Sequence, residues 1–329
     1  MRSHNHSFDR SVLTIAVGPR IYLDMAVALA RSIRLWHDAM DLPVAIATDS
    51  VEPLPADLSG VKTILLKPKE LGVGFEPKLN LDRLAPAQRT LFIDADCLVY
   101  SRLDRAFDAF AGQAVGVVRE RVAKDGERFG DIASYCQYLG VESIPVFTGG
   151  MYYLEGQGAA SVYGEARTLL QSYDQLGLVR LRGLPNEEVL ISGAMARHNL
   201  WGIPDDGLVI GDFQTSPGNA SLDLLRGRRR MTNPPYPSPN HCSWAPVRSI
   251  SPAVVHFLGF HSRLPHYRSE VATLNLLAQG LPPRVARFLA RLVCFWPPST
   301  FALLKSWLRP LYRRVFGARP TLPTDRTTA

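Results

Sequence analysis

The chain has 329 residues, of which 46% are hydrophobic and 20% charged, and its formal net charge is +7. This composition excludes a globally disordered chain and indicates either one large domain with an appendage or two domains. The charge is uneven: residues 281–329 contain nine Lys or Arg and one acid, and this surplus of +8 leaves −1 for residues 1–280. A near-neutral body excludes nucleic acid as its partner, whereas the basic tail indicates contact with an anionic surface.

The four cysteines are far apart and form no Cys-x-x-Cys pair, so the sequence predicts neither a zinc site nor a disulfide framework. The first residues lack an apolar signal segment, and no stretch reaches the ~18 apolar residues that span a bilayer. We therefore predict a cytoplasmic protein that is peripheral on the inner face of a membrane.

Segments with strand and helix patterns alternate at short intervals along the first hundred residues. The predicted strands are 11–17, 43–47, 61–66 and 90–99, and the predicted helices are 21–36 and 76–84. This alternation predicts a doubly wound α/β sheet.

A second set of elements follows. The predicted strands are 114–119, 146–154 and 254–258, and the predicted helices are 158–173 and 186–196, the latter with Asn186 as N-cap. Residues 211–252 are rich in Pro, Gly and Ser and contain Arg226-Gly-Arg-Arg-Arg, so we expect a long irregular segment with a functional role. We place a catalytic or binding domain over residues 8–265 and a helical tail over 266–329.

Two carboxylates, Asp94 and Asp96, interrupt the otherwise apolar run from Leu91 to Val99. The run is typical of a buried strand, in which ionised carboxylates are costly unless a cation compensates them. On a regular strand both side chains point to one face, and Mg²⁺ binds such carboxylates together with substrate phosphates. The pair therefore predicts a metal–phosphate site, although Asp-x-Asp alone also occurs in turns and on solvated strand edges.

His256 follows the short strand Ala253-Val254-Val255. Taken alone, such a histidine is more often a core or surface residue than a ligand. Together with the two carboxylates it is a candidate third metal ligand.

Several motifs, in this order, resemble one family. They are Leu13 to Tyr22, Lys78-Leu79, the Asp-x-Asp run, Phe147-Thr-Gly-Gly-Met-Tyr152, Asn186-Glu187-Glu188-Val-Leu190 and Val254-Val-His-Phe-Leu-Gly259. Together they are similar to the retaining GT-A glycosyltransferases that include glycogenin and the bacterial lipopolysaccharide galactosyl- and glucosyltransferases, the family-8 type. The resemblance implies a GT-A fold, a Rossmann-like mixed sheet flanked by helices, followed here by a basic amphipathic helical tail.

The resemblance also implies an activity and a site. Asp94, Asp96 and His256 would hold Mn²⁺ or Mg²⁺, which binds the diphosphate of a UDP-sugar and stabilises the UDP leaving group. The enzyme would transfer a hexose to a glycan or a lipid-linked acceptor. The donor would lie against Val17, Tyr22 at the uracil, Lys78, Ala95, Thr148, Gly149, Gly259 at the diphosphate, and Arg263.

Three positions at the sugar end depart from the family pattern. Asn186 replaces an Asp, Glu187 replaces a Gln near the anomeric centre, and Thr148 replaces an Asn. Glu187 is thus a candidate catalytic acid or nucleophile-like stabiliser beside Asn186, or simply a charge at a helix N-terminus. Arg263 stands one position after the family's diphosphate-binding Lys.

These departures leave several alternatives open. Retention could proceed by front-face attack or by a covalent double displacement. The chain could instead be a sugar-nucleotide-binding module without turnover, or a nucleotidyltransferase that makes sugar nucleotides, for which Val17-Gly18-Pro19-Arg20 is a poor match to the expected Gly-rich loop.

The tail has two amphipathic helical stretches after Pro283. Arg284, Arg287 and Arg291 share one face in the first, and Lys305, Arg309 and Arg313 share one in the second, opposite stripes of Leu, Val, Phe and Trp. Basic helices with aromatic residues commonly lie in membrane interfaces. We expect residues 281–329 to bind an anionic membrane surface; the alternative is that the stripes dock on the body or on another subunit.

Overall fold

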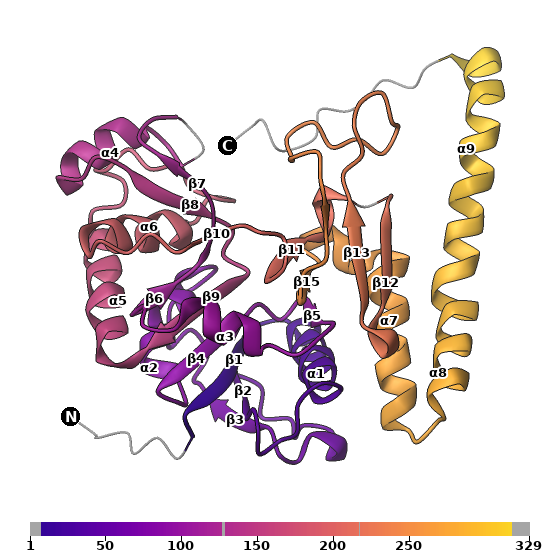
Figure 1. The fold of residues 1–329 in the computed structure, drawn as a ribbon, viewed down its shortest axis with the longest axis horizontal. Helices are drawn as coiled ribbons and strands as arrows, with labels where there is room; N and C mark the ends of the chain where they lie inside the picture. The colour runs from indigo at the N-terminus through magenta and orange to yellow at the C-terminus, as the bar shows by residue number, and fades with distance from the viewer. Residues whose placement is uncertain (1–7, 127–128, 217, 318–329) are drawn as a thin grey trace. The chain divides into compact units, whose positions relative to one another are not determined.

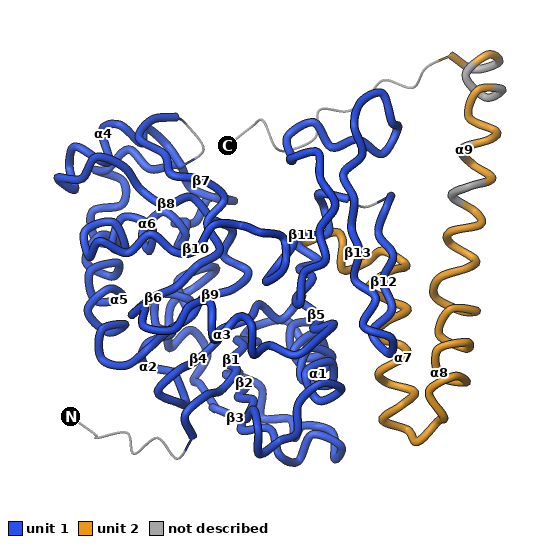
Figure 2. The backbone as a smooth tube through the Cα atoms, in the orientation of Figure 1, with its two compact units in different colours: residues 1–258 blue, residues 259–329 orange. Residues whose placement is uncertain are grey.

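The computed structural model describes residues 8–126, 129–216 and 218–317. The chain forms two compact units, residues 1–258 (unit 1) and residues 259–329 (unit 2), drawn in blue and orange in Figure 2. The sequence predicts the boundary between domain and tail at residue 265.

Unit 1 is built on a six-stranded sheet in the order β3-β2-β1-β4-β9-β6 (Figure 1). Strands β3, β2, β1 and β4 run parallel, while β9 is antiparallel to β4 and β6. Helices flank this mixed sheet, which confirms the predicted α/β class. The strands are β1 Arg10–Ala16, β2 Val44–Thr48, β3 Lys62–Leu65, β4 Arg89–Ile93, β6 Val115–Gly116 and β9 Met151–Glu155.

Two hydrophobic cores lie on the two faces of the sheet, because successive residues of a strand point to opposite sides. On β1, Val12 packs in one core with side chains of helix α1 (Arg20–Arg34), such as Leu29. The next residue, Leu13, packs in the other core with side chains of α5 (Gly156–Gln171) and α6 (Glu187–Arg197). The parallel strand ends that carry the candidate site are therefore held from both faces.

The predicted strand 90–99 is wrong in one respect that matters for function. The structure has β4 ending at Ile93 and a separate short strand, β5 (Cys97–Val99), with residues 94–96 between them. The predicted strand 146–154 is likewise two strands, β8 (Ile144–Phe147) and β9, separated by residues 148–150. In both places a short turn lies between two apolar strands. Asp94 and Asp96, and likewise Thr148 and Gly149, therefore do not lie on a regular strand.

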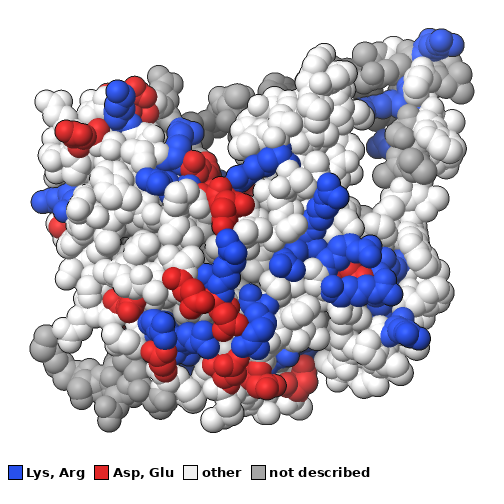
Figure 3. Space-filling view, in the orientation of Figure 1, with Lys and Arg blue, Asp and Glu red and all other residues white. Residues whose placement is uncertain are grey.

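Three smaller sheets complete unit 1. Their orders are β10-β7-β8, β11-β15-β5 and β12-β13-β14. Part of segment 211–252, predicted to be irregular, is thus ordered into the last of these sheets, and Lys and Arg side chains gather over it (Figure 3). The strands are β7 Val118–Ala123, β10 Ile203–Pro204, β11 Ile210–Asp212, β12 Ala220–Asp223, β13 Arg228–Thr232, β14 Ser249–Ile250 and β15 Val254–His256.

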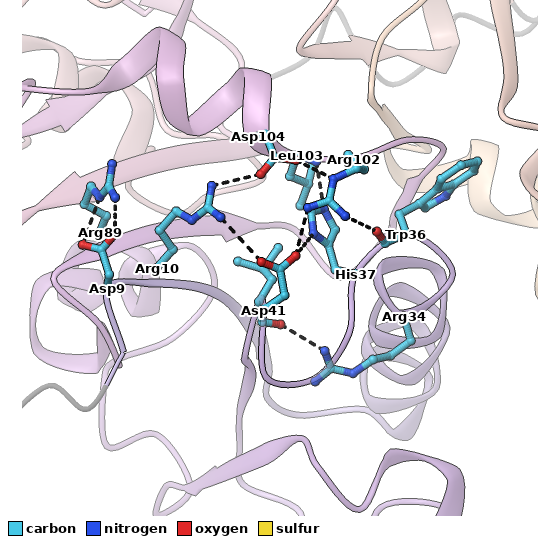
Figure 4. Close-up of polar contacts among 11 residues, drawn as sticks. Asp9, Arg10, Arg34, Trp36, His37, Asp41, Arg89, Arg102, Leu103 and Asp104 are labelled. Atoms are coloured by element: carbon cyan, nitrogen blue, oxygen red, sulfur yellow. Dashed lines mark hydrogen bonds and ion pairs between the residues drawn. The ribbon is translucent and has the colours of Figure 1, made fainter.

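Short helices and a polar network complete the described part of unit 1. The helices are η2 Glu76–Asn80, α2 Leu81–Leu84, α3 Asp104–Phe110 and α4 Ile132–Leu139, with further single 3₁₀ turns at 56–58, 213–215 and 224–226. The buried His37 accepts a hydrogen bond from Leu103 N at its Nε2 (2.9 Å), and its Nδ1 lies 3.2 Å from Asp41 (Figure 4). These bonds satisfy the backbone at the start of α3, so His37 has a structural role.

Unit 2 is helical. It contains a 3₁₀ segment at Gly259–Arg263, then α7 Pro265–Ala278, α8 Pro283–Ala290, a π-helical turn Arg291–Phe295 and α9 Trp296–Phe316, with Pro310 inside α9. Among the described residues, no helix combines the length and apolarity that crossing a membrane requires. Arg319 and Arg326 of the basic tail lie outside the described residues, as do the side chains of Leu311 and Arg313.

Candidate active site

Asp94 and Asp96 lie in a tight turn at the end of β4. Cys97 N donates a hydrogen bond to Asp94 O (3.0 Å), which closes the turn, and Asp94 N donates to Gly150 O (3.0 Å). The turn between β4 and β5 is therefore joined to the turn between β8 and β9. Both carboxylates are partly buried at the C-terminal end of the parallel strands, where open α/β sheets bind their ligands.

Lys78 links this turn to helix α6. Its Nζ lies 2.7 Å from Asp94 Oδ2 and 3.2 Å from Glu187 Oε1, and it donates to Gly149 O at 2.9 Å. Burial lowers the pKa of Lys78, but the charges of Asp94 and Glu187 outweigh burial and raise it. An ammonium has three N–H donors, so these three acceptors use all of them.

Burial raises the pKa of both carboxyl groups that contact Lys78. Glu187 is 3% exposed, and the charge of Lys78 opposes the rise at Glu187 and at Asp94. Lys78 therefore supports two buried carboxylates that would otherwise repel each other in a medium of low polarity.

His256 is buried and oriented by a carboxylate that the sequence analysis did not identify. Strand β11 pairs in parallel with β15, with Asp212 opposite His256, and His256 Nδ1 lies 2.8 Å from Asp212 Oδ1. A carboxylate at this distance fixes the proton on Nδ1. The opposite ring atom, Nε2, is 3.2 Å from Asp96 Oδ1 and 3.9 Å from Asp94 Oδ2.

These residues fit a divalent cation. His256 Nε2 is buried, and two carboxylates converge on it. Burial lowers the pKa of His256, but Asp96 and Asp212 outweigh burial and hold it well above its usual range. The two carboxylates thus favour a positive charge at Nε2, which a proton or a cation can supply. A metal bound to Nε2 would replace that proton, because metal ligation requires the neutral ring.

Cys97 is the third member of the group of potential ligand atoms formed with Asp96 and His256. Burial raises the pKa of its thiol, and Mn²⁺ and Mg²⁺ select oxygen and nitrogen over sulfur. Asp94, whose carboxylate faces the same Nε2, is the better third ligand, as the sequence analysis predicts.

Gly150 allows His256 to reach this position, because a Cβ at residue 150 would lie 2.7 Å from His256 Nδ1. We expect Gly150→Ala to displace the imidazole and to reduce the free energy of unfolding by about 1–3 kcal/mol, as overpacking does. Urea denaturation measures this change. The matched control is Gly164→Ala in α5, where a Cβ meets only the end of Arg167 at 4.0 Å, and where alanine should stabilise the helix. Equal effects of the two substitutions would contradict the steric role of Gly150.

The nucleotide end of the predicted site lies at the same sheet edge. Val17 and Gly18 follow β1, and Gly18 N donates to both carboxylate oxygens of Asp49 (3.0 and 3.2 Å), which follows β2. Tyr22, at the start of α1, has 46% of its surface exposed. An exposed aromatic side chain near this edge is compatible with base stacking, the role that the resemblance implies.

The remaining predicted residues have clear structural partners. Asn186 is the N-cap of α6, as predicted, since its Oδ1 accepts from Glu188 N at 3.0 Å. Glu188 Oε1 accepts from Gly149 N at 2.6 Å, and Thr148 Oγ1 donates to Glu120 Oε1 at 2.8 Å. The segment predicted to lie beside the sugar is therefore held by the first turn of α6 and by β7.

Ala95 is buried inside the Asp-x-Asp turn. Gly259 and Arg263 belong to unit 2, in its 3₁₀ segment, so their predicted contacts with the donor diphosphate stay predictions. Three carboxylates that position the site, Asp49, Asp212 and Glu188, were not predicted as site residues. No local sequence pattern indicates these three carboxylates, because each contacts a backbone or ring atom at least thirty residues away in the sequence.

The comparisons with known proteins find solved structures only. No protein family and no curated protein matches the chain. The galactosyltransferase LgtC, crystallised with donor and acceptor sugar analogs, matches with a TM-score of 0.49 and 14% identity over 82% of this chain and 96% of its own. The bifunctional glycosyltransferase WbbM matches with a TM-score of 0.49 and 14% identity over 82% and 50%. Mouse xyloside xylosyltransferase 1 matches with a TM-score of 0.42 and 15% identity over 62% of this chain and 88% of its own.

These structures are glycosyltransferases, the class that the sequence motifs resemble. With TM-scores below 0.5 and identities of 14–15%, the matches assign neither a family nor an activity to this chain.

Proposed function

We propose that this protein is a metal-dependent, retaining hexosyltransferase that uses a UDP-sugar as donor and a glycan or glycolipid as acceptor. One observation carries the proposal: the buried His256 Nε2 faces the carboxylates of Asp96 (3.2 Å) and Asp94 (3.9 Å) at the carboxyl end of the parallel strands. Asp94, Asp96 and His256 would hold Mn²⁺ or Mg²⁺. When bound, such a cation neutralises the charge that develops on a diphosphate leaving group.

In the proposed reaction the bond between the anomeric carbon and the diphosphate oxygen breaks, and its electron pair stays with UDP. The acceptor oxygen forms the new bond to the anomeric carbon, and its proton passes to the departing phosphate or to solvent. Glu187 is the candidate carboxylate for stabilising positive charge at that carbon, and Lys78 fixes it relative to Asp94 (3.2 and 2.7 Å). Asn186 sets the start of the helix that carries Glu187.

The experiment that tests this function measures UDP release from a panel of UDP-sugars with and without Mn²⁺, in the absence and presence of saccharide acceptors. We expect release that requires the metal and that acceptors accelerate. UDP-sugar binding without release would favour the binding-module alternative. Release of sugar phosphate from a UDP-sugar and pyrophosphate would favour the nucleotidyltransferase alternative.

Asp212 offers a further prediction for the metal. In Asp212→Asn the amide oxygen can still accept from His256 Nδ1, but the negative charge that orients the ring and strengthens its Nε2 as a ligand is gone. We expect the affinity for Mn²⁺ to fall about 10–100-fold. Titration of Mn²⁺ by electron paramagnetic resonance measures this change, and Asp125→Asn, on the exposed loop after β7, is the control. An unchanged affinity in Asp212→Asn would remove Asp212 from the metal site.

We also propose that unit 2 binds an anionic membrane surface, with the protein on the cytoplasmic face. Its helices expose apolar side chains, including Phe288 (54%), Phe301 (68%) and Trp307 (72%), and the basic side chains of Arg284, Lys305 and Arg309 are exposed too. We expect the full-length protein to sediment with anionic but not with neutral liposomes, and the double variant Phe301→Glu/Trp307→Glu to lose this binding. If the variant sediments as the parent protein does, the membrane proposal fails. The alternative is then that the apolar faces of these helices dock on the body or on another subunit.

A further inference from the structure

A cavity of about 340 Å³ in unit 1 borders the candidate active site. Asp212, which hydrogen-bonds to His256, forms part of one wall. Thr148 forms part of another and is followed by Gly149, whose carbonyl accepts from Lys78. Small-molecule sites span about 300–1,000 Å³, so the cavity has room for a small ligand.

The polar side chains around the cavity carry both signs of charge. Glu120 and Asp205 stand with Arg121 and Arg248, and Arg248 is held by Asp205 through the carboxylate and by a bond of 3.0 Å to its backbone carbonyl. Carboxylates accept hydrogen bonds and guanidinium groups donate them, whereas a hydroxyl does both. A phosphate-rich ligand would meet the carboxylates, while a polyhydroxylated, uncharged ligand can pair with both kinds of wall residue.

Trp244 gives the cavity an exposed aromatic side. The residue is 59% exposed and lines the cavity together with Ala245 and Pro246. A large apolar ring exposed beside a cavity is the usual feature of a binding surface rather than of a core.

Asn233, which is 3% exposed, holds the loop that carries Trp244 through hydrogen bonds to its backbone. Asn233 Nδ2 donates to the carbonyls of Cys242 (3.0 Å), Ala245 (2.9 Å) and Pro246 (3.2 Å), and its Oδ1 accepts from Cys242 N (2.8 Å). One buried amide therefore satisfies the backbone on both sides of Trp244. The ring is presented on a preorganised loop, which lowers the entropic cost of binding a ligand against it.

We infer that this cavity, which we call the Trp244 pocket, binds a saccharide with a sugar ring against the indole face, and that this saccharide is the acceptor of the transfer. The second part rests on the proposed function. Because the pocket meets the candidate site at Asp212 and Thr148, a bound saccharide directs one hydroxyl toward the reacting centre. The oxygen of that hydroxyl forms the new glycosidic bond, UDP departs with the electron pair of the bond that breaks, and the hydroxyl proton is released.

The test measures saccharide binding directly and without donor, by saturation-transfer difference NMR on the full-length protein. The probes are lactose and the methyl glycosides of glucose, galactose and N-acetylglucosamine at millimolar concentrations. We expect at least one probe to bind the parent protein, and its dissociation constant to rise about tenfold or more in Trp244→Ala. Trp244→Phe keeps an aromatic face and should retain most of the affinity.

The matched control is Trp307→Ala, which removes another mainly exposed tryptophan (72%, against 59% for Trp244) from α9. It should bind the probe as the parent protein does, and the thermal unfolding of Trp244→Ala should match that of the parent because the ring is mainly exposed. Absence of binding by every probe, or equal binding by the parent and Trp244→Ala, would overturn the inference. Failure of the proposed function has a different signature: no UDP-sugar is turned over, whatever the saccharides do.

Discussion

Replacement of Asp96 by alanine should abolish metal-dependent turnover of the donor while leaving the fold intact. Asp96 Oδ1 faces His256 Nε2 at 3.2 Å, so its loss removes a carboxylate oxygen at the point where the cation would bind. We expect the affinity for Mn²⁺ and the rate of UDP release each to fall at least 100-fold. Since each tenfold change corresponds to about 1.4 kcal/mol, this loss is about 3 kcal/mol. Electron paramagnetic resonance of Mn²⁺ and a UDP-release assay measure the two quantities.

The free energy of unfolding of Asp96→Ala separates a loss of metal binding from a folding defect. Asp96 is partly exposed, and Asp212 still faces His256 when Asp96 is lost, so we expect the free energy of unfolding of the metal-free variant to fall by no more than about 2 kcal/mol. Asp125→Ala, in the exposed loop after β7, is the control for removal of one negative charge. The metal site would be refuted if Asp96→Ala bound Mn²⁺ and a UDP-sugar as tightly as the parent protein.

Local sequence patterns predicted the sheet and where its polar residues lie, because both depend on short-range features. The apolar run before Asp94 is β4, the alternation of strands and helices gives the mixed sheet, and the Asn186 cap begins α6 within one residue of the predicted helix. The energetic cost of two carboxylates in an apolar run indicated that a positive charge compensates them. Lys78 Nζ lies 2.7 Å from Asp94, while the metal at this site stays a prediction.

The geometry of the two turns could not be predicted in the same way. Residues 94–96 and 148–150 are short interruptions between apolar segments, and they are stabilised by each other through Asp94 N and Gly150 O. The alternation of apolar and polar residues gives only a weak signal for such a turn, because a strand follows again after three residues. The carboxylates therefore converge because of a turn and not because of strand periodicity.

Asp212 shows a second limit. It lies in a segment that composition indicated to be irregular, and it reaches His256 only because β11 and β15 pair in parallel register across 44 residues. The Trp244 loop depends on the same kind of information, since Asn233 fixes backbone atoms up to thirteen residues away. Contacts of this kind are set by tertiary structure and leave no local signature.

Lys78→Met should be the most destabilising single change in the site. It removes the ammonium that lies 2.7 Å from Asp94 and 3.2 Å from Glu187, and it leaves the partly buried Asp94 and the buried Glu187 without their cation. Breaking a buried ion pair from one side typically costs about 3–5 kcal/mol. Urea denaturation of the metal-free protein measures the loss, and Lys62→Met, on the exposed edge strand β3, is the control for removing a lysine.

The pH dependence identifies the cause. Burial already raises the pKa of Asp94 and Glu187, and loss of Lys78 should raise both further, so the folded variant binds more protons than the unfolded chain. Its stability then falls as pH rises through the folded pKa values, and the deficit relative to the parent shrinks as pH falls toward about 4, the unfolded value. The double variant Lys78→Met/Glu187→Gln should recover part of the lost stability at neutral pH, because only one buried carboxylate remains. A deficit that is independent of pH and unchanged in the double variant would mean that Lys78 acts through packing, and that the two carboxylates do not depend on its charge.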